Sequence, residues 1–253
     1  MFKRERIAVD NQIFSIEQID DSCWRIEEKG DFTLGVNCFL VVGRDSAMLV
    51  DSGFGQGNIR EVAESITDLP IMLVNTHGDV DHARGYKHFN VAHMHPSEFG
   101  RYHAVVGREA PVSPLWDGEI IELGLRRVEV VLIPGHTQGC IALLDSDNRV
   151  LFGGDSIQDG TIIMDRYDTL KLLAGRDLAA YNASLKKLKK MQDRFDKVYA
   201  AHGNTVLNSS IIDELLTLSE KVLNGELNGI DPPPGMNKKD AKVYSYGSIK
   251  MFY

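Results

Sequence analysis

Four apolar stretches of this chain are each followed by His or Asp next to a glycine, and this constrains the fold more than any other feature. The segments that follow them are Thr76-His77-Gly78-Asp79-Val80-Asp81-His82, Pro134-Gly135-His136-Thr137, Gly153-Gly154-Asp155 and His202-Gly203. Strand ends in a layered α/β protein converge on one rim, where sites are usually built. Glycine lets the backbone turn sharply there. Since imidazole and carboxylate together suit zinc, iron or manganese, the pattern predicts a metal site at a sheet edge.

The first of these segments is the most specific. It holds four ionisable side chains, His77, Asp79, Asp81 and His82, within six positions. Such a cluster would be disfavoured by repulsion and desolvation unless a cation joined it. Each of the other three segments, taken alone, is more often a turn or a helix cap than a ligand. Their combination with the first segment, in this order, favours one shared metal centre.

These motifs resemble those of the metallo-β-lactamase superfamily, in which an HxHxDH motif after a strand precedes a lone His, a bridging Asp and a terminal His. The segment Asp51-Ser52-Gly53 also resembles a structural motif of that family. The resemblance implies an α/β protein, a four-layer αββα sandwich, with two divalent metal ions, zinc being the first choice and iron or manganese possible. The implied ligands are His77, Asp79 and His136 for the first metal, Asp81, His82 and His202 for the second, and Asp155 as a bridge.

One position departs from the family motif, because Asp79 stands where the family has its second His. A carboxylate is a harder ligand than imidazole and favours iron or manganese more than His does, although zinc remains allowed. Two divalent ions (+4), three aspartates (−3) and a bridging hydroxide (−1) give a neutral site, where the usual two-carboxylate site has a charge of +1. The alternative is that Asp79 does not reach the metal and the first site is weak or absent.

The predicted chemistry is hydrolysis by a metal-bound hydroxide. Metal ions lower the pKa of a bound water from 15.7 toward about 7, so hydroxide is available at neutral pH. Asp81 is the predicted catalytic residue, which orients the nucleophile and later carries a proton. Thr76, Thr137 and Asp51 are candidates to fix the ligand rings by hydrogen bonds. A small ester, thioester or lactone is the predicted substrate.

A second hypothesis belongs to a different class of enzyme. His77, His136 and Asp155 could form the two-histidine, one-carboxylate triad of a mononuclear iron centre. This arrangement resembles that of the persulfide dioxygenase branch of the same superfamily. A third and weaker hypothesis is a protein that binds the metal without chemistry.

Two segments without clear periodicity, 96–118 and 156–175, are expected to be irregular loops, and residues 103–118 and 156–175 are expected to overhang the site. The low-specificity candidates for substrate contact in them are Trp116, Met164, Arg166 and Tyr167, each of which could equally pack the loops.

Composition narrows the remaining choices. The net charge of −8 argues against broad nucleic-acid or anionic-membrane binding, so a small molecule is the expected partner. No apolar run approaches the ~18 residues of a membrane span, and the start of the chain lacks the apolar run of a signal peptide. Three widely separated cysteines indicate a reducing, cytoplasmic location. Because ligands from position 77 to 202 must meet, residues 1–253 are predicted to form one domain.

Overall fold

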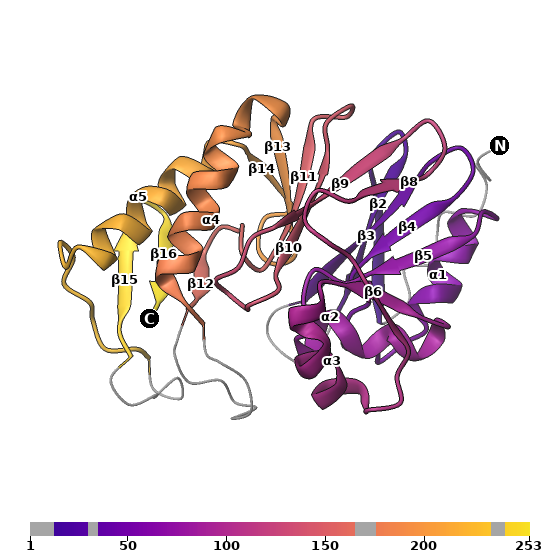
Figure 1. Ribbon diagram of the computed structural model, residues 1–253, viewed down its shortest axis with the longest axis horizontal. Helices are drawn as coiled ribbons and strands as arrows, with labels where there is room; N and C mark the ends of the chain where they lie inside the picture. The colour runs from indigo at the N-terminus through magenta and orange to yellow at the C-terminus, as the bar shows by residue number, and fades with distance from the viewer. Residues whose placement is uncertain (1–12, 30–34, 165–175, 234–240) are drawn as a thin grey trace. The chain divides into compact units, whose positions relative to one another are not determined.

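The computed structural model describes residues 13–29, 35–164, 176–233 and 241–253 (Figure 1). By their internal contacts, the residues divide into two compact units, Met1–Val130 and Val131–Tyr253. Each unit has its own sheet, its own helices and its own cluster of buried apolar side chains.

The first unit is built on a seven-stranded sheet in the sequential order β1 to β7. Its strands are β1 (Phe14–Asp20), β2 (Cys23–Glu28), β3 (Val36–Val42), β4 (Ala47–Val50), β5 (Ile71–Val74), β6 (Ala92–Met94) and β7 (Val112–Pro114). Neighbouring strands are antiparallel from β1 to β4 and parallel from β4 to β7. The parallel half matters for function, because it brings the carboxyl ends of its strands to the same edge.

Helix α1 (Ile59–Ile66) shows how the sequence specifies the elements of this unit. Asn58 caps it by accepting a hydrogen bond from the backbone N–H of Glu61, and Ile59, Val62, Ala63 and Ile66 form its buried face. That spacing is typical of an amphipathic helix, which packs its apolar stripe against a core. Strands β3 and β4 are buried at every position, and this explains their continuous apolar sequences.

The prediction of an irregular loop at 96–118 is wrong for much of that segment. It contains the 3₁₀ turn η2 (Pro96–Glu98), helix α3 (Phe99–Val106) and strand β7. The buried residues of α3 are Arg101 and Tyr102 rather than an apolar stripe. A helix whose buried face includes an arginine lacks the apolar periodicity from which helices are predicted.

The second unit contains four strands in the order β14-β13-β11-β10 and a separate three-stranded sheet in the order β12-β16-β15. Their bounds are β10 (Ile141–Asp145), β11 (Val150–Gly154), β12 (Thr161–Ile163), β13 (Lys197–Ala200), β14 (Val206–Asn208), β15 (Val243–Tyr246) and β16 (Ile249–Phe252). Strand β9 (Arg127–Leu132) runs across the boundary between the units, and β8 (Ile120–Glu122) pairs antiparallel with it. The prediction of a loop at 156–175 missed β12, and residues 165–175 of that segment lie outside the described residues.

Two helices of thirteen residues each, α4 (Leu178–Lys190) and α5 (Ile211–Leu223), lie side by side in the second unit (Figure 1). Their buried apolar residues belong to the core cluster of this unit. Asp177 caps α4 by accepting from the N–H groups of Ala179 and Ala180. The remaining short helices of the described residues are α2 (Val80–Ala83), η1 (Arg84–His88) and η3 (Gln192–Arg194).

No helix among the described residues is both long and apolar enough to cross a membrane.

Candidate metal centre

In the first unit, two adjacent parallel strands end together. Val50 of β4 pairs with Val74 of β5, and the N–H of Asp51 donates to the carbonyl of Val74 at 2.8 Å. The chain that leaves β4 therefore starts with Asp51 next to the chain that leaves β5, which carries Thr76 and His77. Strand pairing alone brings these distant parts of the sequence to one edge.

Asp51 connects the two strand ends to helix α2. Its carboxylate is buried and accepts hydrogen bonds from the N–H of Thr76 (2.7 Å), from Thr76 Oγ1 (2.9 Å) and from His82 Nδ1 (2.9 Å). The backbone of Asp51 has a φ of +62°, a left-handed conformation that Asp tolerates better than most residues. Asp51 therefore holds the ring of His82 and the residue before His77, as predicted.

These contacts determine which ring nitrogen of each histidine can serve as a ligand. A carboxylate only accepts, so His82 Nδ1 carries the proton toward Asp51. Since Thr76 gives its hydroxyl proton to Asp51, its oxygen accepts from His77 Nδ1 at 3.1 Å. In both histidines Nδ1 forms the hydrogen bond that orients the ring, which leaves the lone pair of Nε2 to bind a metal.

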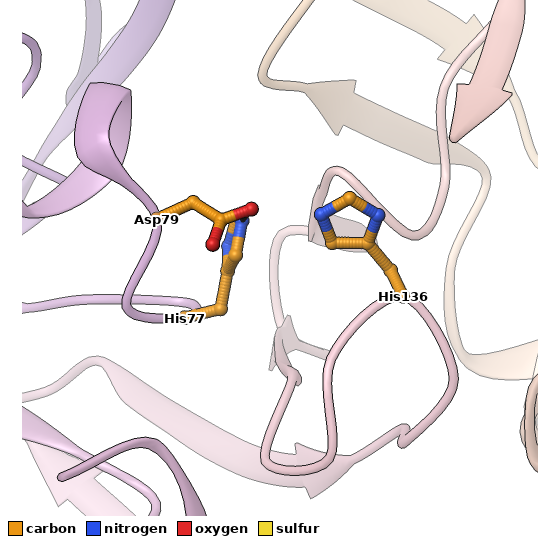
Figure 2. A group of neighbouring side chains, drawn as sticks. All are labelled: His77, Asp79 and His136. Atoms are coloured by element: carbon orange, nitrogen blue, oxygen red, sulfur yellow. Dashed lines mark ion pairs between the residues drawn. The ribbon is translucent and has the colours of Figure 1, made fainter. Parts of the chain in front are cut away.

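The four predicted ligands of the first unit lie close together. The ring centroids of His77 and His82 are 4.1 Å apart. Nε2 of His77 lies 3.6 Å from Oδ2 of Asp79, and Nε2 of His82 lies 3.6 Å from Oδ2 of Asp81. Figure 2 shows the Asp79 carboxylate beside the His77 imidazole, on the loop that follows β5. Asp79 is thus turned toward its neighbouring ligand candidate, and its shorter side chain does not prevent this.

The second unit repeats the arrangement with another pair of parallel strands. Gly154 of β11 pairs with Ala200 of β13, so that Asp155 and His202 follow neighbouring strand ends. Oδ1 of Asp155 lies 3.3 Å from Nε2 of His202, while Oδ2 lies 3.6 Å from Nε2 of His136. One carboxylate therefore faces two imidazoles with different oxygens.

His136 is oriented by backbone groups of its own unit. Its Nδ1 donates to the carbonyl of Ile163 in β12 at 2.9 Å, which again leaves Nε2 as the ligand atom. A Cβ on the preceding Gly135 would lie only 2.6 Å from Cα of Tyr181, so only glycine lets the His136 loop approach α4 this closely. The prediction that Thr137 fixes a ligand ring is wrong. Its hydroxyl contacts Cys140 Sγ at 2.9 Å instead.

The donor set and its spacing fit a divalent metal. Two ligands of one zinc ion, each about 2.0–2.2 Å from it at a tetrahedral angle, lie roughly 3.3–3.6 Å apart. The four imidazole–carboxylate distances within the units range from 3.3 to 3.6 Å. At 3.6 Å a nitrogen and an oxygen are too far apart for a good hydrogen bond. All seven predicted ligands are among the side chains whose donor atoms could hold a metal ion.

Sequence reasoning missed two charged residues next to Asp79, Glu98 and Arg101. Arg101 Nη1 donates to Asp79 Oδ1 at 2.5 Å, and its Nε lies 3.9 Å from Glu98 Oε2. The same Glu98 oxygen accepts from the N–H of Gly78 at 2.9 Å. Both side chains are buried, and both lie in the segment for which the sequence predicted a loop. The sequence signal for this pair was the opposite charges of Glu98 and Arg101 at a spacing of three residues.

The predicted substrate-contact residues differ in their surroundings. Trp116 is 57% exposed and meets the ring of His95 edge-on, with centroids 5.6 Å apart. Met164 is fully buried in the core cluster of the second unit. Arg166 and Tyr167 lie outside the described residues.

The three cysteines offer no further ligand to this centre. Cys23, Cys38 and Cys140 are all buried, and all are free thiols. Burial, with the nearby carboxylate of Asp51 as a smaller cause, raises the pKa of the Cys38 thiol well above its ordinary value. Cys38 therefore stays protonated and unreactive at neutral pH.

Comparisons with known proteins agree with this description. The family model of the metallo-beta-lactamase superfamily matches residues 32–202. The chain is 28% identical to the acyl-coenzyme A thioesterase MBLAC2 of Gallus gallus over 207 residues, which cover 66% of this chain and 72% of that protein. It is 25% identical to the hydroxyacylglutathione hydrolase GloC of Haemophilus influenzae over 146 residues, which cover 50% of this chain and 68% of that protein.

Solved structures show the same fold. A metallo-beta-lactamase from Pontibacter korlensis superposes with a TM-score of 0.68 at 18% identity, covering 82% of this chain and 99% of that one. The predicted α/β class and metallo-β-lactamase fold are thereby confirmed.

The chain belongs to the metallo-beta-lactamase superfamily, because the family model spans well over half of it. Within that superfamily it is a metal-dependent hydrolase, as predicted from the strand-end ligands.

Proposed function

We propose that the seven predicted ligands hold two divalent metal ions, with zinc as the native metal. The first ion is assigned to His77, Asp79 and His136, the second to Asp81, His82 and His202, and Asp155 is the bridge. All seven positions lie within the segment that the family model matches, residues 32–202. The observation that carries the proposal is Asp155, whose two oxygens face different imidazoles at 3.3 and 3.6 Å. The two units work in this proposal as one catalytic domain, residues 1–253.

The proposed reaction is hydrolysis of a thioester. The choice of a thioester is supported by the two relatives described above, which are named an acyl-coenzyme A thioesterase and a hydroxyacylglutathione hydrolase. When bound, the two ions supply a water of lowered pKa and polarise the carbonyl oxygen of the substrate. Asp81, whose Oδ2 faces His82, is the group that orients the attacking water and carries its proton to the leaving thiolate.

The substrate is a small molecule, and the acidic balance of −8 disfavours nucleic acid or an anionic membrane as partner. The cytoplasm is the proposed compartment, supported by three buried cysteines that are all free thiols.

Thiol release from defined thioesters tests this function. We expect the purified chain to hydrolyse an acyl-coenzyme A or a hydroxyacylglutathione, and to lose the activity when a chelator removes the metal. Asp81→Asn keeps the shape of the side chain but removes both the base and a carboxylate ligand of the second ion, so kcat should fall by at least roughly 10²–10⁴-fold. Asp147→Asn, an exposed aspartate of a turn, is the matched control and should retain full activity. Equal activity of wild type and Asp81→Asn would contradict the assigned role, and no thioester turnover by metal-loaded protein would contradict the substrate class.

A further inference from the structure

The position at which this chain departs from its family motif is also the position that contacts a buried arginine. Asp79 replaces the usual histidine, and Arg101 of α3 donates to its Oδ1 at 2.5 Å. Asp79 is only 17% exposed at its side chain and Arg101 only 6%. An ion pair this sheltered has a fixed geometry, unlike the long flexible pairs of a protein surface.

The two oxygens of Asp79 are divided between different partners. Oδ1 is bound by Arg101, while Oδ2 lies 3.6 Å from Nε2 of His77, within the spacing of two ligands on one metal. An aspartate without such a contact could bind a metal with either oxygen or with both. With Oδ1 in contact with Arg101, Oδ2 is the oxygen on the side of His77, where a metal ion would be bound.

Arg101 also lies close to a second carboxylate, that of Glu98. Glu98 is 1% exposed, its Oε2 lies 3.9 Å from Arg101 Nε, and the same oxygen accepts from the N–H of Gly78. Gly78 lies between His77 and Asp79 in the sequence, so Glu98 ties the backbone of the ligand loop to the arginine that contacts its side chain. The turn η2 and helix α3 thus each support this loop through one charged side chain, Glu98 and Arg101.

The charges around Asp79 alternate. The guanidinium of Arg101 places one positive charge directly at this additional carboxylate, and Glu98, 3.9 Å from the same guanidinium, balances that charge in turn. Arginine keeps its charge at any pH relevant to proteins, so the contact with Asp79 persists as an ion pair.

We infer that Arg101 is a positioning residue that holds Asp79 as a one-oxygen metal ligand, so that the Asp79–Arg101 pair replaces the second histidine of the family motif. The inference rests on the proposed metal site and concerns how this chain completes it. A consequence is that the residues at positions 79 and 101 are coupled. Metal binding by an aspartate at position 79 requires Arg101, whereas metal binding by a histidine at position 79 does not.

A double-mutant cycle on metal affinity tests the inference. The proteins are wild type, Arg101→Met, Asp79→His and Asp79→His/Arg101→Met, and zinc affinity is measured by competition with a chromophoric chelator. Loss of a group that supports a metal ligand costs about 10–100-fold in metal affinity. We expect this loss for Arg101→Met in the wild-type background. In the Asp79→His background, removal of Arg101 should leave zinc affinity unchanged or raise it. A neutral imidazole gains no ion pair from the guanidinium, whose positive charge only opposes the binding of a cation.

The other outcomes overturn the inference. An equal loss in both backgrounds would show that Arg101 only supports the fold. Tighter zinc binding by Arg101→Met in the wild-type background would show that Arg101 acts only as a nearby positive charge that repels the metal. Urea unfolding of the metal-free proteins shows whether each variant folds. Arg101→Lys, which keeps the charge beside Glu98, serves if Arg101→Met does not fold, and should bind zinc more weakly than wild type since it lacks the guanidinium geometry.

The same zinc-affinity measurements distinguish a failure of this inference from a failure of the proposed function. Arg108, an exposed arginine of the loop after α3, provides the matched control, and Arg108→Met should bind zinc as wild type does. If wild type bound no divalent metal at all, the proposed function would fail together with the inference. If wild type bound zinc and the cycle showed no coupling, only the role of Arg101 would be wrong.

Discussion

Replacement of Asp155 by Ala is expected to abolish hydrolysis and to lower the metal content of the protein. Its two oxygens face His136 and His202, so the change removes one ligand from both proposed ions at once. The loss of kcat/KM should exceed the roughly 10–100-fold that follows removal of a group supporting a ligand. Thioester turnover and metal analysis of the same preparation measure both effects.

The fold should survive this substitution. Asp155 follows the end of β11 and is not a member of the apolar core clusters, so the urea midpoint of the metal-free protein should stay close to that of wild type. Asp147→Ala, in an exposed turn of the same unit, controls for the loss of an acidic side chain. Turnover near the wild-type rate in folded Asp155→Ala would refute its place at the metal centre.

Asp51→Ala is expected to weaken both the fold and the metal site. Three donors now satisfied by its buried carboxylate would be left without it: the N–H and the hydroxyl of Thr76, and Nδ1 of His82. A buried donor that loses its partner costs about 1–3 kcal/mol, so the free energy of unfolding should fall by about 3 kcal/mol or more. Urea unfolding of the metal-free protein measures this loss.

Asp51→Asn separates positioning from stability. The amide keeps the shape of the side chain, but it has only one acceptor oxygen for the three donors. We expect it to lose less stability than Asp51→Ala and to bind zinc about 10–100-fold more weakly than wild type, because the rings of His77 and His82 are no longer both held. Zinc affinity equal to that of wild type would show that Asp51 has a purely structural role.

The sequence predicted those parts of the fold in which apolar periodicity and turn signals agree. Strands β4 and β10 and helix α5 are elements of this kind, because each is a clear apolar or amphipathic segment of the sequence. Helix α3 and strand β12 were missed. The first buries an arginine, and the second is only three residues long and pairs with β16 from the end of the chain.

In the candidate site, too, the sequence predicted the features that follow a local pattern and missed those that depend on tertiary contacts. Its ligand candidates could be named from the sequence because they follow strands in a family pattern, and the support of two ligand rings by Asp51 and Thr76 was predicted with them. The support of Asp79 by Arg101 could not be, because that contact joins residues 22 positions apart through a helix with no apolar stripe. Contacts of this kind depend on tertiary packing and leave no local pattern.

The metal content of protein purified without added metal tests the central claim most directly. The account predicts close to two zinc ions per chain, together with thioester hydrolysis that disappears and returns as the metal is removed and restored. One iron ion per chain, with sulfur-dependent oxygen uptake and no thioester turnover, would contradict it.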